Sequence, residues 1–417
     1  MPANTLFLLS AVDCKNETCS TLRMLEGSEY SPGLNLEAIE KLRALGHGYV
    51  SRGELPSAQM ALARHGQLIL SCAWGEVHTG QGTHPASPET LYVGFSTTKA
   101  VVSAAIWTLL QQGRLSEEDH VTQYVGGFDT HGKEVVTVSN LLTHTAGFPN
   151  APFPSSSWPS VQQRTETFSS WHLDWEPTTR FHYHGTSTMW VLAAIIEAIT
   201  EMDFRLYIRD HLTAPLELND LYVGLPDERQ EHVAEISHVG TSPTAESLAS
   251  IGLSGLAKAS PDESYLESYN KAEKRAAGVP GAGGIMTATS LALFYQRLLH
   301  PETHGLFQPD TIERGRVIQT GTLTDPFTGR AANRSLGLVI AGDEDRVYRS
   351  FAPSHSPHTF GHPGAGGQIG WADPVSGLSF AFLTNGCERN PLNIGMRTLS
   401  LSNQAAQCLS TKDTPHG

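Results

Sequence analysis

The sequence contains no run of eighteen consecutive apolar residues, so no segment is long enough to cross a membrane. Its first residues, MPANTLFLLSAVDC, include a short apolar stretch without the basic residues that open a signal peptide. Basic residues are scarce overall, with 28 Lys and Arg against 42 Asp and Glu, which gives a formal net charge of −14. Because an acidic surface repels phosphate backbones, nucleic acid is not an expected partner.

Cysteine is also scarce, and its spacing matches no metal or redox motif. The five cysteines are odd in number and irregularly placed, at Cys14, Cys19, Cys72, Cys387 and Cys408. This pattern predicts reduced thiols and a cytoplasmic location.

Two catalytic signatures are missing. No serine stands in G-x-S-x-G, which argues against an α/β-hydrolase nucleophile elbow, and H-E-x-x-H is absent as well. Histidines cluster in SHSPHTFGH (residues 354–362) and FHYHG (residues 181–185), so a metallohydrolase stays open as an alternative. The sequence predicts neither a metal nor a cofactor.

The pattern of apolar residues predicts helices and strands along most of the 417 residues. LNLEAIEKLRALGHG, from Leu34, is typical of an amphipathic helix capped by Asn35 and ended by Gly46. Two strands are expected around a His65–Gly66 turn, and a C-terminal hairpin around residues 373–377. Residues 100–110 are apolar on all sides, which predicts a buried helix ending at Gly113.

Strands at both ends of the chain, with helices between them, predict an α/β fold of the α+β type. In it, an antiparallel sheet flanked by helices carries an inserted, mostly helical lobe. The expected parts are an N-terminal extension (1–33), an α/β lobe (34–115 and 278–417) and a helical lobe (116–277). The active site is expected between the two lobes.

Ser96 and Lys99 stand immediately before the buried helix, in a chain with only eight lysines. Residues three apart share a helix face, so the hydroxyl and the amine can touch. A serine hydroxyl attacks only when a base takes its proton, and burial lowers the pKa of a lysine enough for it to serve as that base. A helix N-terminus also favours a developing oxyanion. The pair therefore predicts an acyl-transfer nucleophile.

S-x-x-K alone is a weak signal, and the alternatives are structural. Ser96 could be a helix cap, with the Lys99 amine reaching solvent. A second copy, Ser268 to Lys271, lies in the charged stretch DESYLESYNKAEKR and is interpreted as a solvated helix face.

Four further segments follow Ser-Thr-Thr-Lys in order. They are VSNLLTHTAGFPN (138–150), WEPTTRFHYHGTSTMWVLAAIIEAI from Trp175, GVPGAGGIMTA from Gly278 and TFGHPGAGGQIGWADPVSGLSFAFLTN from Thr359. Together they resemble the serine β-lactamase-like superfamily, which includes class C β-lactamases, penicillin-binding proteins and family VIII carboxylesterases. The resemblance runs from about residue 58 to residue 400 and implies a β-lactamase/penicillin-binding-protein-like fold.

The resemblance also implies roles for single residues. Ser96 matches the nucleophile, Lys99 its partner base, and Tyr183 the tyrosine of the second motif, which shuttles a proton between serine, leaving group and water. Without the resemblance, Tyr183 would be an ordinary half-buried aromatic.

The third motif falls on His362-Pro363-Gly364, where lactamases have Lys-Thr-Gly. By the same resemblance, the oxyanion hole should be formed by the Ser96 amide and an amide just after this motif, that of Ala365. His362, Gly364 and Ala365 are thus the expected substrate-binding and oxyanion residues.

Two departures from the lactamase pattern point toward esters. Gly185 replaces the asparagine of the second motif, and His362, a mostly neutral residue near pH 7, replaces the lysine of the third. H-x-G in this place resembles family VIII carboxylesterases. Phe153 and Trp158, in a Pro- and Ser-rich loop, could line a substrate pocket, although loop anchoring is the favoured interpretation.

The sequence therefore predicts a serine carboxylesterase that hydrolyses short-chain esters through an acyl-enzyme on Ser96, with a small-molecule ester as its partner. Weak β-lactam hydrolysis, a β-lactamase or D-peptidase activity, and acyl transfer to a small acceptor remain alternatives. A non-catalytic binding relative is disfavoured by the intact Ser96, Lys99 and Tyr183. The oligomeric state is not predicted.

Overall fold

A computed structural model describes residues 10–14, 17–21, 33–250, 252–258 and 262–409. Its centre is a nine-stranded sheet in the order β1-β2-β4-β3-β15-β14-β13-β12, with β5 paired to β4. All its strand pairs are antiparallel. The strands are β1 (Ser10–Cys14), β2 (Glu17–Thr21), β3 (Ser57–Arg64), β4 (Gln67–Thr79), β5 (Gly82–Pro85), β12 (Val339–Ile340), β13 (Phe360–Gly364), β14 (Gln368–Asp373) and β15 (Leu378–Thr384).

The two ends of the chain meet inside this sheet, where β3 pairs with β15 from Ala58 opposite Thr384 to Arg64 opposite Leu378. The predicted hairpin turn lies between β3 and β4, and both His65 (φ +50°) and Gly66 (φ +75°) adopt the left-handed conformation that a tight turn requires. The predicted C-terminal hairpin joins β14 to β15. The α/β fold class is thereby confirmed.

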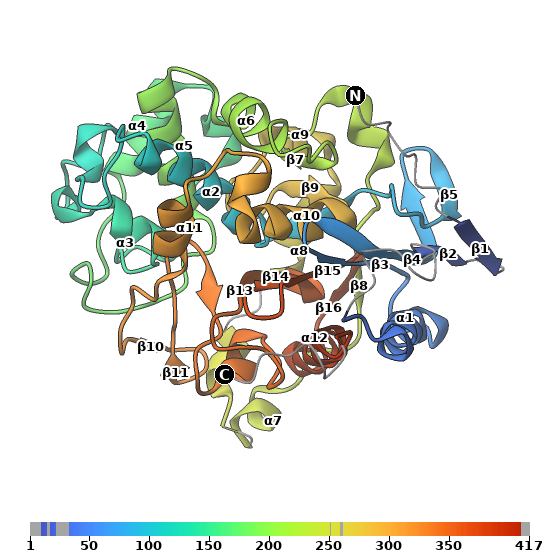
Figure 1. Cartoon of the computed structure of the whole chain (residues 1–417). Coiled ribbons are helices and arrows are strands. Elements are labelled where there is room, and N and C mark those ends of the chain that lie inside the picture. The colour runs from blue at the N-terminus through green and yellow to red at the C-terminus, as the bar shows by residue number, and fades with distance from the viewer. Residues whose placement is uncertain (1–9, 15–16, 22–32, 251, 259–261, 410–417) are drawn as a thin grey trace.

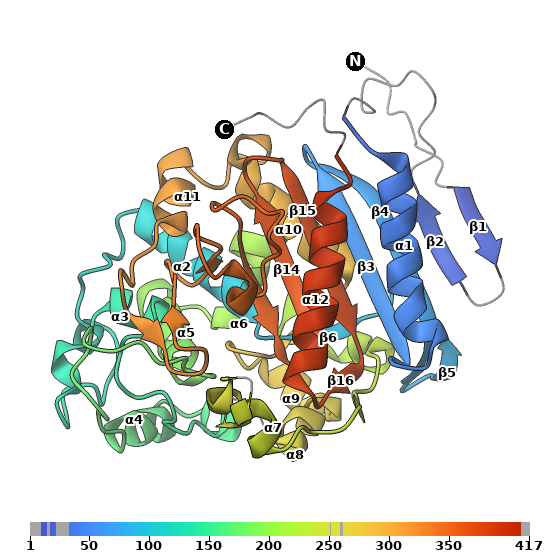
Figure 2. The same ribbon diagram turned by 90° about the horizontal axis from the view of Figure 1, so that it is seen from below.

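Helices cover both faces of the sheet. Helices α1 (Leu36–Ser51) and α12 (Pro391–Ala406) pack together on one face, and α10 (Ala288–Leu299) lies on the other, against β3, β14 and β15 (Figures 1 and 2). Asn35 caps α1 as predicted, because its side chain accepts a hydrogen bond from the Ala38 amide.

The predicted end of α1 at Gly46 is wrong, since the helix continues to Ser51. Gly46 is buried, and a Cβ built on it would lie 2.8 Å from the indole of Trp74. This glycine therefore allows the helix to approach the sheet closely and does not end it.

Helix α2 (Thr98–Gln111) is the buried helix that the sequence predicts, with every residue from Thr98 to Leu109 buried. It lies between the sheet and a group of helices at the opposite side of the molecule (Figure 1). The other helices are α3 (Val138–Leu142), α4 (Val161–Ser169), α5 (Ser187–Thr200), α6 (Phe204–Ile208), α7 (Ala245–Ser250), α8 (Glu263–Glu267), α9 (Ala272–Ala277) and α11 (Pro309–Arg316). The predicted lobe boundaries stay a prediction, and the described residues include only part of the expected N-terminal extension.

Besides the nine-stranded sheet, the described residues form three smaller sheets. The first has the order β6-β9-β7 and leads directly into α2. Its strands are β6 (Tyr92–Phe95), β7 (Leu221–Val223) and β9 (Gly284–Met286). The two further pairs are β8 (Ser237–Val239) with β16 (Gly386–Glu388) and β10 (Thr324–Asp325) with β11 (Arg330–Ala331).

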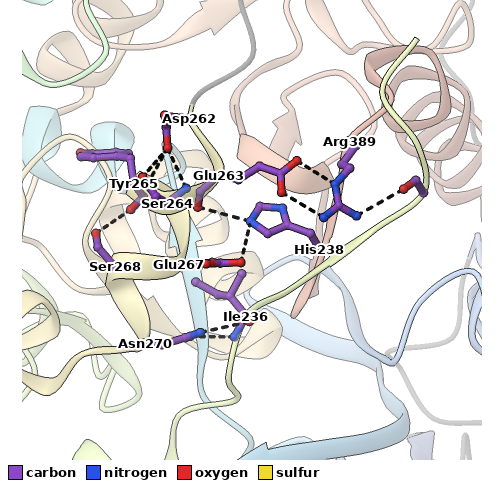
Figure 3. Close-up of polar contacts among 11 residues, drawn as sticks. Ile236, His238, Asp262, Glu263, Ser264, Tyr265, Glu267, Ser268, Asn270 and Arg389 are labelled. Carbon is purple, nitrogen blue, oxygen red and sulfur yellow. Dashed lines mark hydrogen bonds and ion pairs between the residues drawn. The ribbon is translucent and has the colours of Figure 1, made fainter.

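A polar network holds α8 against the strand pair β8–β16 (Figure 3). Arg389 donates two hydrogen bonds to the Glu263 carboxylate, at 2.7 and 2.9 Å, and a third to the Gly240 carbonyl. The Asn270 side chain bonds both backbone groups of Ile236. The charged stretch around α8 is therefore fastened to the edge of the core.

The expectation of reduced thiols is wrong for Cys72, which is disulfide-bonded. Cys19 lies directly opposite Cys72 in the register of β2 and β4. Cys387 and Cys408 are free and buried. Within the described ranges, no helix combines the length and apolar character needed to traverse a bilayer.

Candidate active site

Ser96 lies in a turn between β6 and α2, where its side chain is partly exposed. The preceding residue, Phe95, has φ +46°, a conformation rarely adopted by a bulky residue and typical of functional turns. Thr98 holds this turn, because its hydroxyl donates to the Phe95 carbonyl (2.5 Å) and accepts from the Gly284 amide (2.8 Å). The conformation that presents Ser96 is thus fixed from two sides.

Lys99 is completely buried and directed at Ser96, as predicted. Its Nζ lies 3.3 Å from Ser96 Oγ and 2.7 Å from each of the Gly185 and Gly281 carbonyl oxygens. The alternative in which the amine reaches solvent does not hold in this structure. The Gly185 and Gly281 carbonyl oxygens occupy two hydrogen-bonding positions of the Lys99 nitrogen, and its third position faces the Ser96 hydroxyl.

Burial lowers the pKa of Lys99, and the nearby Arg334 cation lowers it further, while Tyr183 opposes both effects. A lowered pKa increases the fraction of neutral amine at a given pH. A neutral Lys99 has two hydrogens for the two carbonyls and a lone pair for the Ser96 proton.

Tyr183 is a second side chain that contacts the Ser96 hydroxyl. Its Oη donates to Ser96 Oγ at 2.8 Å, and Lys99 Nζ lies 4.8 Å from the centre of its ring. The structure thus brings Ser96, Lys99 and Tyr183 together.

His144 supports the Tyr183 segment, although the sequence motifs do not single it out within THTAG (residues 143–147). The two rings lie 4.9 Å apart, His144 Nδ1 accepts from the His184 amide (3.2 Å), and the His144 carbonyl accepts from the His182 amide (3.2 Å). Burial holds the pKa of His144 well below its usual range, so it packs as a neutral ring.

Gly281 was also missed, although its segment contributed to the resemblance. Its carbonyl binds Lys99, and a Cβ on it would lie 2.9 Å from the Gly185 carbonyl oxygen. The close approach of two backbones requires glycine here. No local signal identifies such a carbonyl, because the contact depends on chain segments far apart in the sequence.

His362 lies on β13 and is 1% exposed, with its ring centre 6.1 Å from that of Tyr183. Nδ1 bonds the Pro363 carbonyl (2.7 Å), and Nε2 is buried without a hydrogen-bond partner among the described residues. Burial holds the pKa of His362 well below its usual range, so this histidine does not replace the lactamase lysine as a cation.

Gly364 brings the end of β13 against the nucleophile turn. A Cβ on Gly364 would lie 2.6 Å from the Gly94 carbonyl oxygen, two residues before Ser96. Ala365, the next residue, is partly exposed. The assignment of the Ser96 and Ala365 amides to an oxyanion hole stays a prediction.

The second S-x-x-K copy forms no comparable site. Ser268 Oγ donates to the Tyr265 carbonyl at 2.6 Å, and Lys271 is exposed (Figure 3 includes Ser268). Lys271 is solvated as predicted, whereas Ser268 is half-buried and Lys271 has an extended backbone, so the two residues do not share a helix face.

Phe153 and Trp158 anchor their loop on α5. Their rings lie 4.7 and 4.9 Å from that of Trp190, and Trp158 Nε1 donates to the Glu197 carboxylate. A cavity of about 580 Å³ borders Trp158, and another of about 470 Å³ borders Tyr49. Neither cavity is lined by Ser96, Lys99 or Tyr183.

The histidine clusters form no metal site among the described residues. Within the part of the chain that the structure describes, no three His, Cys, Asp or Glu side chains converge as a metal site would require.

Comparison with known proteins adds to this geometry. The model of the family described as Beta-lactamase matches residues 38–403. A putative D-alanyl-D-alanine carboxypeptidase of Escherichia coli (strain K12) is 26% identical over 412 residues, covering 92% of this chain and 91% of the relative. Esterase/beta-lactamase LipL of Mycobacterium tuberculosis is 25% identical over 340 residues, covering 78% and 76%.

Among solved structures, a family VIII carboxylesterase superposes with a TM-score of 0.71 at 22% identity. The match covers 89% of this chain and 99% of that one. This likeness concerns the fold.

Proposed function

The chain belongs to the Beta-lactamase family, whose fold and hydrolase character it shares, and on that premise we propose that it is a serine carboxylesterase acting on short-chain esters. One observation carries the proposal: Ser96 Oγ is contacted by both Lys99 Nζ and Tyr183 Oη. A nucleophile with two proton-transfer groups is what acyl transfer needs.

In the proposed acylation, neutral Lys99 takes the Ser96 proton as Oγ attacks the ester carbonyl. Tyr183 then gives its hydroxyl proton to the leaving alkoxide and regains one from Lys99. The products are an alcohol and an acyl-enzyme, with Lys99 neutral again. The positive end of α2, together with the Ser96 and Ala365 amides, would stabilise the oxyanion.

In deacylation, a water molecule gives one proton to the Tyr183–Lys99 pair, and its oxygen attacks the acyl carbonyl. The same proton returns to Ser96 Oγ as the acid leaves, so the enzyme is restored.

Esters are favoured over amides by the surroundings of the site. Gly185 has no side-chain amide to orient a substrate amide, and His362 is held neutral by burial. His362, Gly364 and Ala365 remain the proposed substrate-binding and oxyanion residues.

An amide hydrolase is the second candidate, favoured by the names of two relatives, a putative D-alanyl-D-alanine carboxypeptidase and an esterase/beta-lactamase. Acyl transfer to an alcohol would use the same acyl-enzyme. Turnover of ethyl butyrate, nitrocefin and D-alanyl-D-alanine peptides, and the product ratio with added methanol, separate these activities.

Labelling with a fluorophosphonate followed by peptide mass spectrometry tests the nucleophile. We expect the label on Ser96. In Ser96→Ala, both the label and the hydrolysis of ethyl butyrate should be lost. Ser268→Ala is the matched control and should keep both. Full ester turnover by Ser96→Ala would refute the proposal.

The proposed organisation remains an α/β lobe (34–115 and 278–417) with a helical lobe (116–277). A cytoplasmic location stays a prediction from composition. The disulfide at Cys72 argues against it, because disulfides persist chiefly in oxidising compartments.

A further inference from the structure

Arg397 is a buried cation on α12 that the proposed mechanism does not use. Its side chain belongs to a residue that is 3% exposed, although arginine is seldom fully buried in proteins. Its Nη2 donates a hydrogen bond to the Gly366 carbonyl at 2.9 Å. Gly366 lies in the turn of residues 365–367 that joins β13 to β14, and Ala365 of this turn carries the proposed oxyanion amide. A charged side chain outside the catalytic group therefore contacts the proposed oxyanion turn.

The turn fits closely between β16 and α12. Gly366 has φ +73° and Gly367 has φ +107°, a backbone that side chains other than hydrogen rarely allow. A Cβ on Gly366 would lie 2.7 Å from Cys387 Sγ on β16, and a Cβ on Gly367 would collide with Arg397 Nη2. The two glycines thus let the turn approach the guanidinium.

Ala365 lies between two points at which the backbone is held. On one side, Gly364 packs against the Gly94 carbonyl of the turn that presents Ser96. On the other side, Arg397 holds the Gly366 carbonyl. An amide stabilises an oxyanion best when it is oriented before the charge develops. The hydrogen bond from Arg397 fixes the part of the turn that follows the Ala365 amide.

The other contacts of the guanidinium are weaker. Glu388 Oε2 lies 4.0 Å from Nη1, at the limit of an ion pair, and Nε is buried without a hydrogen-bond partner among the described residues. Burying a guanidinium is costly, and an apolar side chain of similar volume would often stabilise a protein as well or better. The hydrogen bond to Gly366 therefore points to a role in the conformation of the turn and not in stability alone.

We propose that Arg397 is a positioning residue, which holds the Gly366 carbonyl so that the Ala365 amide points at the oxyanion formed when Ser96 attacks an ester. This inference rests on the proposed esterase function and adds a residue to it. The oxyanion exists only after attack, so the substrate itself does not need this orientation. Loss of the contact should therefore lower kcat and leave KM almost unchanged.

The kinetics of two variants on ethyl butyrate test the role. Arg397→Gln should lower kcat about 10- to 100-fold at an almost unchanged KM, because a small displacement of an oriented donor is costly. Arg397→Lys keeps a charged donor with a shorter reach, so its kcat should fall only about 3- to 10-fold. An unchanged kcat in Arg397→Gln, or a loss confined to KM, would overturn the proposal.

Arg275→Gln is the matched control. Arg275 is 7% exposed, and its Nη2 donates to a backbone carbonyl, that of Gln230, at 3.1 Å. Its substitution should lower the urea concentration at the midpoint of unfolding, and kcat should stay within about twofold of the wild-type value. Equal losses of kcat in Arg275→Gln and Arg397→Gln would assign the effect to general destabilisation and overturn the positioning role.

Should Arg397→Gln not fold, Arg397→Lys decides, and a wild-type kcat in that variant would overturn the proposal. The rate at which a fluorophosphonate labels Ser96 gives a second measurement, since its phosphoryl oxygen also gains negative charge during attack. This rate should fall in parallel with kcat, and an unchanged rate would contradict the role of Arg397. Failure of the esterase function has a different signature, because the wild-type protein would then leave ethyl butyrate intact while the labelling rates still report on the turn.

Discussion

Lys99 Nζ lies 2.7 Å from the carbonyl oxygen of Gly281, a residue 182 positions further along the chain. The same nitrogen lies equally close to the Gly185 carbonyl. The base that faces Ser96 is therefore positioned by two backbone segments that lie outside its own helix.

Gly281→Ala should displace the Gly281 carbonyl that positions the Lys99 amine. The new Cβ would lie 2.9 Å from the Gly185 carbonyl oxygen and 3.0 Å from Thr186 Cα, so the backbone must shift. We expect kcat/KM for ethyl butyrate to fall about 10- to 100-fold, because small misplacements of reacting groups are costly.

Two alanine variants control for this effect. A Cβ on Gly185 would meet no atom of the described residues within 4 Å, so Gly185→Ala should cost much less activity than Gly281→Ala. Gly395→Ala, on α12, also meets none and should leave activity unchanged while raising the free energy of unfolding by about 0.5–1 kcal/mol. Full activity in Gly281→Ala would contradict the positioning role.

Activity should rise with pH. Burial lowers the pKa of Lys99, and only its neutral form accepts the Ser96 proton, so kcat/KM should increase as pH rises through the lowered pKa and then level off. Lys99→Arg should lose about 10³-fold or more at every pH, because arginine does not deprotonate. A pH profile of ethyl butyrate hydrolysis measures both, and a flat profile from pH 5 to 10 would contradict this role for Lys99.

Stability should fall on acidification. Burial lowers the pKa of His184 to about 3 and that of His355 to about 4, from 6.5. Between these values and pH 6.5 the unfolded state binds more protons, so the free energy of unfolding decreases as pH falls, by about 1.4 kcal/mol per pH unit for each histidine.

Urea unfolding between pH 5 and 8 measures this slope. His184→Gln removes one of the titrating groups and should make the slope shallower. It should also lower stability at pH 7, since His184 Nε2 accepts from the Phe148 amide and Nδ1 bonds the His182 carbonyl. An unchanged slope would contradict the prediction.

Trp158→Ala should destabilise the protein without changing its acyl preference. The indole is 4% exposed and packs on Trp190, so its loss should cost about 3–5 kcal/mol in unfolding free energy. Val161→Ala, on an exposed side chain of α4, should cost less than about 0.5 kcal/mol. A changed preference between ethyl acetate and ethyl hexanoate would instead make Trp158 a pocket residue.

Regular patterns in the sequence predicted much of the fold. The all-apolar run of α2 could only be buried, and the His65–Gly66 turn fixed the first hairpin. The predicted helix end at Gly46 was wrong because a glycine that ends a helix and one that packs against Trp74 look alike in sequence. The disulfide bond of Cys72 could not be predicted from the spacing of the cysteines, because folding and not distance along the chain decides which cysteines meet.

The candidate site was predicted only in part for a related reason. Ser96, Lys99 and Tyr183 belong to recognisable motifs, whereas the Gly281 carbonyl acts through its backbone and carries no side-chain signal. Arg334 stands in the unremarkable stretch AANRSLG, and its position beside Tyr183 arises only when the chain is folded.

The pairing of β3 with β15 sets a condition on synthesis of the protein. Until β15 leaves the ribosome, the edge of β3 that faces away from β4 has no partner strand, although almost all side chains of β3 are buried in the folded protein. A truncated chain that stops before β15 should aggregate and be degraded by proteases. A frameshift shortly before β15 would therefore be as damaging as one early in the reading frame.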